Sequence, residues 1–256
     1  MTTEHRKVAL VTGAARRIGR SIALALAARG WDVAVHFRQS EDDAAATVRD
    51  IEALGRRAAP VKCDLSDETE TRELLARAAR ALDAPVSCVV NNASLFEHDD
   101  ATSFSVAALD AHMHANLAAP LILAQALHAA TPEGRQAVVV NILDQKLFNL
   151  NPDFLSYTLS KAALHTATIM LAQALAPKLR VVGVAPGITL VSGDQTPEGF
   201  AKAHTVTPLG RSSTPEDVAA TVCFAAESPA ITGTTLIVDG GQHLIPLPRD
   251  VMFVAK

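Results

Sequence analysis

The chain has 256 residues and a net charge of −4 at pH 7. It is long enough for one large α/β domain or two small ones, and we expect one, because no linker, repeat or low-complexity tract interrupts it. The Lys and Arg residues are spread along the chain, which argues against a basic face for nucleic acid. No apolar run approaches the length of a membrane span, so the sequence predicts a cytoplasmic protein without a membrane or nucleic-acid partner.

Short β-rich runs alternate with apolar residues at helical spacing along most of the chain. Strands are expected at residues 7–11, 31–37, 58–62, 87–91, 136–142, 180–184 and 236–238, and helices at 18–29, 42–54, 67–82, 105–130, 154–176 and 215–226. Strands that alternate with helices and are apolar throughout belong to a parallel sheet covered on both faces. The sequence therefore predicts an α/β fold with a doubly wound parallel sheet of about seven strands.

Two stretches do not fit this alternation. Residues 188–214 are long, mixed in composition and interrupted by glycines and prolines. A loop of this length in a compact domain is usually functional, so we expect a lid over the substrate site. Residues 240–256 are also irregular, and their apolar end, 251–254, is expected to pack against another part of the protein.

The cysteines and histidines do not have the spacing of metal ligands. Cys63, Cys88 and Cys223 lie far apart in or beside apolar segments, which favours buried, reduced thiols. His112 and His114 have no third ligand at a suitable spacing and are expected on the surface of a helix. No metal site is predicted.

A glycine-rich turn follows the first strand and opens the first helix, reading Thr12-Gly13-Ala14-Ala15-Arg16-Arg17-Ile18-Gly19. Gly13 allows the tight turn, Gly19 allows close packing of the helix, and the helix N-terminus offers free amides to a pyrophosphate. Arg17 stands where the usual fingerprint has its middle glycine. The alternative to a phosphate-binding loop is a glycine turn with no ligand.

The end of the second strand indicates which dinucleotide would bind. An NAD site places an acid there for the ribose 2′-hydroxyl, but residues 36–40 contain no carboxylate. Arg17, Arg38 and Ser40 could instead surround a 2′-phosphate, which predicts NADPH as the cofactor. The alternative is that Arg38 is a solvated surface residue. Asp64 is placed to contact the adenine edge, and Asn91-Asn92-Ala93 would lie at the carboxyl edge of the sheet, where ligands bind.

Tyr157 and Lys161 are four residues apart, on one face of an expected helix. Phenol titrates near 10, and a nearby ammonium stabilises phenolate, so this pair could deliver a proton near neutral pH. Asp144 lies thirteen residues before the tyrosine. Ser156, directly before Tyr157, is not expected to take its place.

These motifs occur in the order found in the short-chain dehydrogenase/reductase family, which the chain resembles over essentially its whole length. The resemblance implies a single Rossmann domain, usually in a tetramer, with Tyr157 as proton donor. It also implies that Lys161 lowers the pKa of the tyrosine and holds the nicotinamide ribose, and that Asn116 supports the lysine through a water. Cofactor contacts are expected from Gly13, Arg16, Arg17, Ile18, Gly19, His36, Arg38, Ser40, Asp64, Leu65, Asn92, Ala93, Ser94, Tyr157, Lys161, Pro186, Gly187 and Thr189.

One departure from the family narrows the resemblance. Most members have serine at the position of Asp144; the aspartate, together with Arg17 and the segments 36–40 and 92–96, resembles the pteridine reductases and the bacterial dihydropteridine and dihydromonapterin reductases. This resemblance implies that Phe96 stacks on a flat pterin opposite the nicotinamide and that Ser94 binds near the cofactor phosphate and the substrate. Substrate contacts are thus expected from Ser94, Phe96, Asp144 and Tyr157.

Three details qualify this resemblance. Thr189 stands where those enzymes often have serine, and Phe96 is alternatively a core aromatic. Arg249 is not assigned to the C-terminal arginine that some pteridine reductases insert into a neighbouring subunit, because its spacing from the glycines at 240 and 241 does not agree.

The sequence thus favours an NADPH-dependent reductase of a C=N bond in a dihydropterin or dihydrofolate. A ketone needs a neutral hydrogen-bond donor at its oxygen, whereas reduction of C=N requires a proton on nitrogen, and an acid coupled to a tyrosine suits that task. Asp144 could alternatively cap a turn or face solvent. The competing hypotheses are an NADPH-dependent carbonyl or 3-oxoacyl reductase and a non-catalytic dinucleotide-binding protein.

Overall fold

The computed structural model describes residues 6–191 and 196–254. In this part of the chain seven parallel strands form one sheet in the order β3-β2-β1-β4-β5-β6-β7. The strands are β1 (Lys7–Val11), β2 (Trp31–Phe37), β3 (Ala58–Lys62), β4 (Cys88–Asn91), β5 (Ala137–Ile142), β6 (Leu179–Pro186) and β7 (Thr235–Val238). The longer helices are α1 (Arg17–Ala28), α2 (Glu41–Ala53), α3 (Glu68–Leu82), α4 (Val106–Met113), α5 (Ala119–Ala130), α6 (Leu155–Ala174), α7 (Pro197–Thr205) and α8 (Pro215–Glu227).

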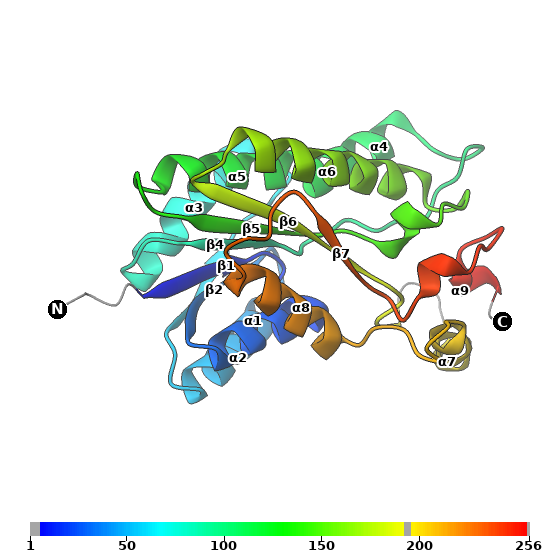
Figure 1. Ribbon diagram of the computed structural model, residues 1–256, viewed down its shortest axis with the longest axis horizontal. Coiled ribbons are helices and arrows are strands. Elements are labelled where there is room, and N and C mark those ends of the chain that lie inside the picture. Colours follow the sequence, from blue (N-terminus) through cyan, green and yellow to red (C-terminus); the bar gives the residue numbers. More distant parts are fainter. Residues whose placement is uncertain (1–5, 192–195, 255–256) are drawn as a thin grey trace.

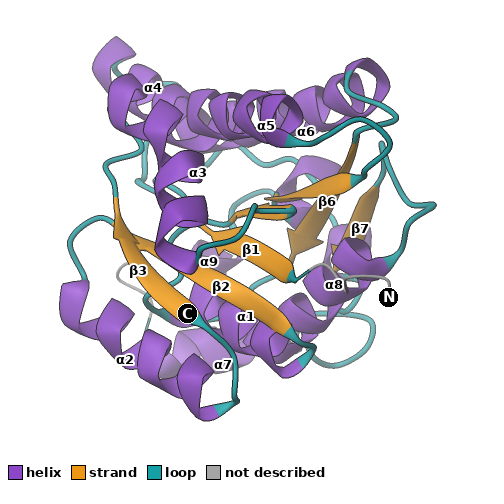
Figure 2. Cartoon of the chain, turned by 90° about the vertical axis from the view of Figure 1, so that its left-hand side faces the viewer, coloured by secondary structure: helices purple, strands orange, loops and turns teal. Residues whose placement is uncertain are grey.

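The sheet lies between two layers of helices (Figure 1; Figure 2). Helices α1, α2 and α8 cover one face, and α3, α5 and α6 cover the other. Side chains alternate across a strand, so β1 contributes Ala9 and Val11 to the core on one face and Val8 and Leu10 to the core on the other. Both faces are covered, which explains why the strands read as unbroken apolar runs. The predicted doubly wound α/β fold is confirmed.

The strand order places a crevice at the carboxyl ends of β1 and β4. The chain adds β2 and β3 on one side of β1 and then returns to its other side with β4, where Val11 pairs with Val90. Ligands in open α/β sheets bind at such a reversal, outside the carboxyl ends of the strands. The glycine-rich turn follows β1, and Asn92 follows β4, so both lie at this reversal.

The helix predicted at residues 105–130 is interrupted by a π-helical turn, η1 (His114–Ala118), between α4 and α5. Pro120 has no N–H to donate to the carbonyl of Asn116, which explains a wider turn before it. His112, which was expected at the helix surface, is buried, and its Nδ1 lies 2.8 Å from the carbonyl oxygen of Ala108.

The same helix corrects the expectation about apolar runs. By length and composition alone, Val106–Ala130 is long and apolar enough to cross a membrane. In this fold, however, its α5 part covers the sheet, with Leu123 and Leu127 fully buried.

The two stretches expected to be irregular contain short helices. Within 188–214, α7 begins after Thr196, whose hydroxyl accepts a hydrogen bond from the backbone N–H of Gly199. Residues 192–195 of this stretch lie outside the described residues. The tail contains η3 (Gln242–Leu244) and α9 (Val251–Val254). Helices α7 and α9 contact each other beyond the carboxyl end of the sheet (Figure 1). Val251 is buried, as expected for the apolar end of the tail.

Candidate active site

Two cavities open at the carboxyl edge of the sheet. The first, here called the loop cavity, has a volume of about 620 Å³ and is lined by the glycine-rich turn and by the segments that follow β2, β3 and β4. The second, the tyrosine cavity, has a volume of about 580 Å³ and contains Asp144, Tyr157 and Lys161. Arg17, Ile18, Asn92 and Ser94 line both cavities, which therefore adjoin each other.

The glycine-rich turn has the geometry of a close-packed strand-to-helix connection. Gly13 has a φ of +63°, and a Cβ at Gly19 would lie only 2.2 Å from the carbonyl oxygen of Gly13. Arg17 has a φ of +55°, a left-handed conformation that costs a non-glycine residue roughly 1–2 kcal/mol. The position where the fingerprint has glycine thus keeps the glycine conformation. The Arg17 guanidinium donates to the carbonyl oxygen of Val191, 2.9 Å away, and so connects the turn to the predicted lid.

His36 connects the glycine-rich turn to the neighbouring strands through its two ring nitrogens. The backbone N–H of Gly13 donates to its Nδ1 at 2.9 Å, and its Nε2 lies 3.1 Å from the carbonyl oxygen of Cys63. Burial lowers the pKa of His36 to about 4, so the ring is neutral at pH 7. We predicted a cofactor contact for His36, but both ring nitrogens bind protein atoms. It lines the loop cavity and acts there by joining the turn to β2 and β3.

The outer part of the loop cavity is basic. Arg38 is exposed, Ser40 is half-buried, and both line the cavity together with Arg16 and Arg17. Arg16 also lies 3.4 Å from an oxygen of Asp43 in an exposed ion pair.

The carboxylate predicted near the adenine, Asp64, follows β3 and lines the same cavity with Leu65. The backbone N–H and the hydroxyl of Ser66 donate to Asp64 at 2.9 and 2.7 Å, and these hydrogen bonds lower the pKa of Asp64.

Two asparagines form hydrogen bonds that hold the segments near the carboxyl ends of the strands. Asn92 donates to the carbonyl oxygen of Thr12 at 2.9 Å. Asn116, buried in η1, accepts from the backbone N–H of Leu95 at 2.8 Å and donates to Ser160 at 3.0 Å. Its side chain also accepts from the Ser94 hydroxyl at 3.2 Å. The direct contacts of Asn116 therefore hold the segment that leads to Phe96, and the water-mediated link to Lys161 stays a prediction.

Asp144 and Tyr157 are hydrogen-bonded. The Tyr157 hydroxyl donates to Oδ2 of Asp144 at 2.8 Å, while Oδ1 accepts from the backbone N–H of Lys146 at 2.8 Å. Asp144 therefore caps the short 3₁₀ helix η2 (Gln145–Phe148) and binds the tyrosine at the same time. Lys161 donates to the carbonyl oxygen of Ile142 at 2.8 Å, and its Nζ lies 5.8 Å from the centroid of the Tyr157 ring.

The pKa values of Asp144, Tyr157 and Lys161 differ from those expected for an isolated tyrosine–lysine pair. Burial and the charge of Asp144 raise the pKa of Tyr157 well above its ordinary value, in contrast to the predicted lowering by Lys161. Burial also raises the pKa of the Asp144 carboxyl and lowers the pKa of Lys161 to about 8. Of the three groups, Lys161 thus has the pKa closest to neutral pH, and Asp144 keeps its proton to a higher pH than an ordinary aspartate does.

Phe96 is not a core aromatic. Its side chain is 40% exposed and lines the tyrosine cavity. The ring stacks on Phe154 with centroids 4.4 Å apart, and it forms an edge-to-face contact with the Tyr157 ring with centroids 4.7 Å apart. A planar ligand beside Tyr157 would therefore have an aromatic neighbour.

Beyond the end of β6, the chain forms another wall of the tyrosine cavity. Pro186, Gly187 and Thr189 all line it. A Cβ at Gly187 would lie 2.4 Å from the hydroxyl of Ser212, and the Thr189 hydroxyl bonds Gly187 and Ser213. Ser156, by contrast, donates to Asp99 through its hydroxyl, away from Asp144, as expected.

The sequence-based prediction missed several residues of the tyrosine cavity. Gln145 lies beside Asp144, and among the described residues its buried Oε1 has no hydrogen-bond partner. Asp250, Val251 and Met252 enter from the C-terminal tail. Only the apolar end of the tail gave a signal in the sequence, and that signal did not indicate where it packs.

The three cysteines are buried and free, and burial raises their pKa values to about 11 or 12. Within residues 6–191 and 196–254, no group of three or more His, Cys, Asp or Glu side chains is placed to hold a metal ion.

Known proteins share this fold and much of this sequence. A family model described as short chain dehydrogenase matches residues 7–198. Two solved structures of FolM alternative dihydrofolate reductase 1 with NADP, from Brucella canis and Brucella suis, are 42% and 41% identical to this chain, with TM-scores of 0.87 and 0.86. The alignments cover 93% of this chain and 95% and 96% of those chains.

A 3-oxoacyl-acyl-carrier-protein reductase from Synechocystis sp. is 32% identical over 247 residues, which are 94% of this chain and 99% of the relative. An L-rhamnose 1-dehydrogenase (NAD(P)(+)) from Sphingomonas sp. is 31% identical over 248 residues, which are 93% and 96% of the two chains. The family match spans most of the chain and agrees with the fold and with the order of the motifs. The protein therefore belongs to the short-chain dehydrogenase/reductase family and is an oxidoreductase.

Proposed function

We propose that the protein is an NADPH-dependent reductase that acts on a C=N bond of a dihydropterin or a dihydrofolate. The observation that carries this proposal is the 2.8 Å hydrogen bond between the Tyr157 hydroxyl and Asp144. An acid coupled to a tyrosine suits protonation of a ring nitrogen, whereas a ketone reductase needs a neutral donor at this place. The similarity to two dihydrofolate reductases of the FolM type supports the same substrate class.

The loop cavity fits the phosphates and adenosine of NADP(H). Gly13 and Gly19 allow the turn to pack closely at the N-terminus of α1, where backbone amides attract a pyrophosphate. Arg17, Arg38 and Ser40 would bind the 2′-phosphate, which guanidinium groups recognise through paired hydrogen bonds. NADP is also the dinucleotide in the two FolM structures. When bound, the reduced cofactor supplies the hydride.

The residues of the tyrosine cavity would supply the proton. A protonated Asp144 donates to the phenol oxygen of Tyr157, and the phenol in turn donates its own proton to the substrate nitrogen. One hydride on carbon and one proton on nitrogen convert C=N into CH–NH, and Asp144 is left as the carboxylate. Because burial raises the pKa of Asp144, the protonated carboxyl is populated closer to neutral pH than for an ordinary aspartate. Lys161 would hold the cofactor ribose.

The substrate would lie against Phe96. Its exposed ring faces the cavity that contains Tyr157, and aromatic rings attract flat heterocycles through offset stacking. Ser94 lines both cavities and so would reach the substrate and the cofactor together. The segment 188–191, which also lines the cavity, would act as part of a lid.

A carbonyl or 3-oxoacyl reductase is the second candidate, because the relative at 32% identity is named as a 3-oxoacyl-acyl-carrier-protein reductase. The test is a steady-state screen of NADPH oxidation with several dihydropterins, dihydrofolate and a few ketones. Turnover of ketones without turnover of any dihydropterin would refute the proposal.

Variants of Asp144 separate the two candidates at the level of the residue. Asp144→Asn keeps a hydrogen-bonding side chain but removes the proton relay, so kcat for a dihydropterin should fall by about 10²-fold or more, the size typical of general acid catalysis. Asp144→Ser should likewise fail with dihydropterins. If Asp144→Ser instead preserves or improves the turnover of the accepted substrate, Asp144 is not required for the reaction, and the carbonyl reductase is favoured.

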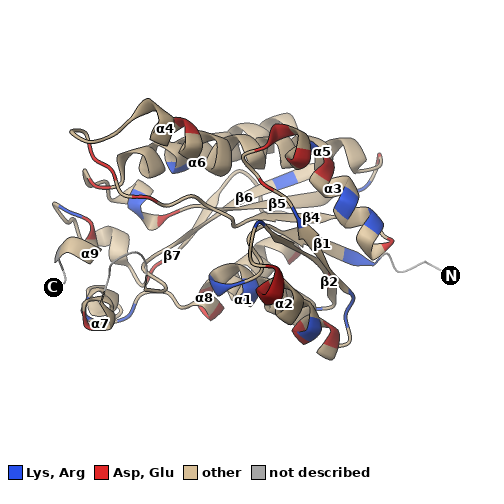
Figure 3. Ribbon diagram, turned by 180° about the vertical axis from the view of Figure 1, so that it is seen from behind, with Lys and Arg blue, Asp and Glu red and all other residues tan. Residues whose placement is uncertain are grey.

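We also propose a homotetramer. Leu159, Ile169 and Met170 of α6 are exposed although apolar. Helices α5 and α6 together carry one Lys or Arg and no Asp or Glu, whereas charged residues are frequent on α2 and α3 (Figure 3). Such a face favours burial against another copy. Light scattering should give about four times the 26.9 kDa of one chain, and Ile169→Glu should lower that mass. A wild-type monomer would refute this assembly.

A further inference from the structure

The C-terminal residues Arg249 to Phe253, here called the strap, lie across the tyrosine cavity of their own chain. Asp250, Val251 and Met252 line this cavity beside Asp144 and Lys146. The strap follows a proline-containing segment at residues 246–248. Three sets of contacts hold the strap in this position.

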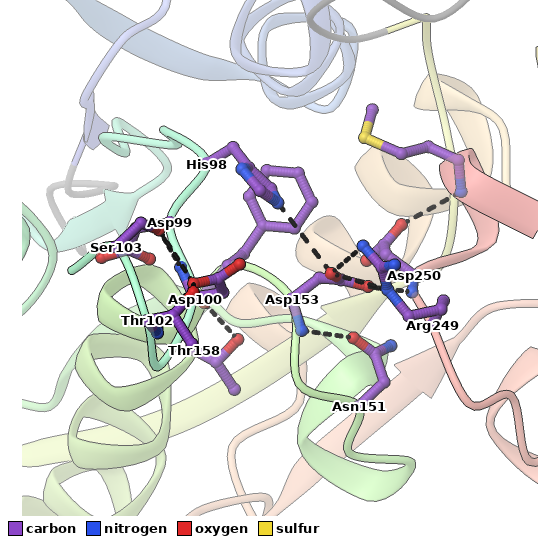
Figure 4. A network of polar contacts seen from close by, with 12 residues as sticks. His98, Asp99, Asp100, Thr102, Ser103, Asn151, Asp153, Thr158, Arg249 and Asp250 are labelled. Carbon is purple, nitrogen blue, oxygen red and sulfur yellow. Dashed lines mark hydrogen bonds and ion pairs between the residues drawn. The ribbon is translucent and has the colours of Figure 1, made fainter.

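The first contact is an ion pair with Asp153, in the segment that leads into α6. The Arg249 Nε lies 2.9 and 2.8 Å from the two carboxylate oxygens of Asp153, and its terminal NH2 group lies 2.6 Å from one of them. The backbone N–H of Asp250 donates to the same carboxylate at 2.7 Å. Figure 4 shows Asp153 between His98 and the strap. Asp153 is buried, and the hydrogen bond from Arg249 lowers its pKa, so the carboxylate is charged and fully engaged.

The second contact joins the strap to η2, next to the proposed acid. Lys146, which is buried, donates to Asp250 at 3.1 Å. The backbone N–H of the same lysine donates to Oδ1 of Asp144. One residue thus holds both the strap and the carboxylate that binds Tyr157.

The third contact is aromatic. Phe253 of the strap stacks on Phe154 with centroids 6.1 Å apart, and Phe154 stacks on Phe96. Phe154 has a φ of +57°, a strained conformation for a large side chain. A strained backbone conformation persists only where the surrounding contacts hold it in place, and such positions are often found at functional sites. The ring proposed to hold the substrate is therefore supported, through Phe154, by the strap.

We propose that Arg249 and Asp250 are positioning residues that fix the strap as a wall of the substrate site and so determine which substrates fit. The inference rests on the proposed function for the identity of the substrate. The strap would limit the size of the substituent that a dihydropterin carries. Cofactor binding in the loop cavity would not depend on it, since no strap residue lines that cavity among the described residues.

The experiment compares Arg249→Gln and Asp250→Asn with the wild type, with small and large dihydropterins as substrates. Each variant should raise the KM by about tenfold, a loss of about 1.4 kcal/mol in binding. Each should also reduce the discrimination between small and large substrates. The Kd of NADPH should not change, and hydrogen exchange should rise in residues 249–254. Arg249→Lys, which keeps the charge but not the paired geometry, should restore part of the loss.

Arg72→Gln is the matched control. The Arg72 side chain is 52% exposed, as is that of Arg249, and it pairs with Glu68 on α3, away from both cavities. It should leave the KM and the hydrogen exchange of the strap at wild-type values.

The inference is overturned if hydrogen exchange in residues 249–254 becomes faster in Arg249→Gln and Asp250→Asn while every KM stays at the wild-type value. Absence of dihydropterin turnover by the wild type would instead refute the proposed function. The same variants, measured with an accepted ketone, would then still decide whether the strap shapes the substrate site.

Discussion

Replacing Gln145 with methionine should make the protein more stable and less active. The Oε1 atom of Gln145 is buried beside Asp144 with no partner among the described residues. A buried acceptor without a hydrogen bond costs about 1–3 kcal/mol. Methionine has a similar length and no polar oxygen, so Gln145→Met should raise the free energy of unfolding by about 1 kcal/mol. For a chain of this size that corresponds to an increase of about 2–4 °C in Tm.

The loss of activity follows from the same atom. The N–H groups of a dihydropterin would reach Oε1 once the Gln145 side chain turns towards the cavity that it lines, and methionine would leave one of these N–H groups unpaired. A penalty of about 1–2 kcal/mol lowers kcat/KM by about tenfold or somewhat more. Thermal unfolding and steady-state NADPH oxidation measure the two effects on the same preparation.

Glu52→Met provides the control, because Glu52 is exposed on α2, outside both cavities and away from the α5 and α6 face proposed for the tetramer. It should change neither quantity. A lower Tm together with an unchanged kcat/KM for Gln145→Met would refute the reasoning, since Gln145 would then be a satisfied structural residue.

Three further predictions concern charge. The folded pKa of His36, about 4, lies below its ordinary 6.5, so the unfolded state binds more protons between these values and stability should fall as pH falls through this window, by up to about 1.4 kcal/mol per pH unit. Denaturant unfolding at pH 7 and pH 5 should show a smaller loss for His36→Asn than for the wild type, and equal losses would contradict the assignment. Arg38→Asp should reduce the preference for NADPH over NADH by at least about tenfold in direct binding, because a charge-assisted contact with the 2′-phosphate becomes a repulsion; an unchanged ratio would place the 2′-phosphate elsewhere. Besides burial, the charge of Asp250 raises the pKa values of Asp144 and Tyr157, and Lys146 and Lys161 are the cations that face the same two groups. Asp250→Asn removes this negative charge and should therefore shift the pH profile of kcat/KM towards lower pH. A shift in the opposite direction would show that another group controls the profile.

The fold could be predicted well because its signals are local. Short apolar runs such as residues 8–11 are typical of a strand covered on both faces, and the structure has β1 at the predicted residues, Lys7–Val11. The π-helical turn could not be predicted from periodicity alone, since it arises where Pro120 withholds one hydrogen bond inside an otherwise regular helix. Helix α7 was missed because Gly199 and the flanking glycines outweighed the Thr196-Pro197 start signal.

The site was predictable where short motifs carry it, either just after a strand, as Asp144 follows β5, or at helical spacing, as Tyr157 and Lys161 do on α6. Asp144, Tyr157 and Lys161 were expected together, and the structure brings them to one cavity. Their pKa shifts were not predictable, because the pKa of Tyr157 depends on burial and on the charge of Asp144 and the hydrogen bond to it. The position of the strap also could not be predicted from the sequence. An arginine at residue 249 and an aspartate at residue 153 are 96 positions apart, and only the folded chain shows that they pair.

The adjoining walls of the two cavities have a consequence for inhibition. Arg17, Ile18, Asn92 and Ser94 face both spaces, so a dinucleotide in the loop cavity would complete one side of the tyrosine cavity. Compounds aimed at the tyrosine cavity should then bind the dinucleotide complex more tightly than the free protein and inhibit uncompetitively with respect to NADPH. A screen against the free protein would miss such compounds, whereas a screen with NADP present would find them.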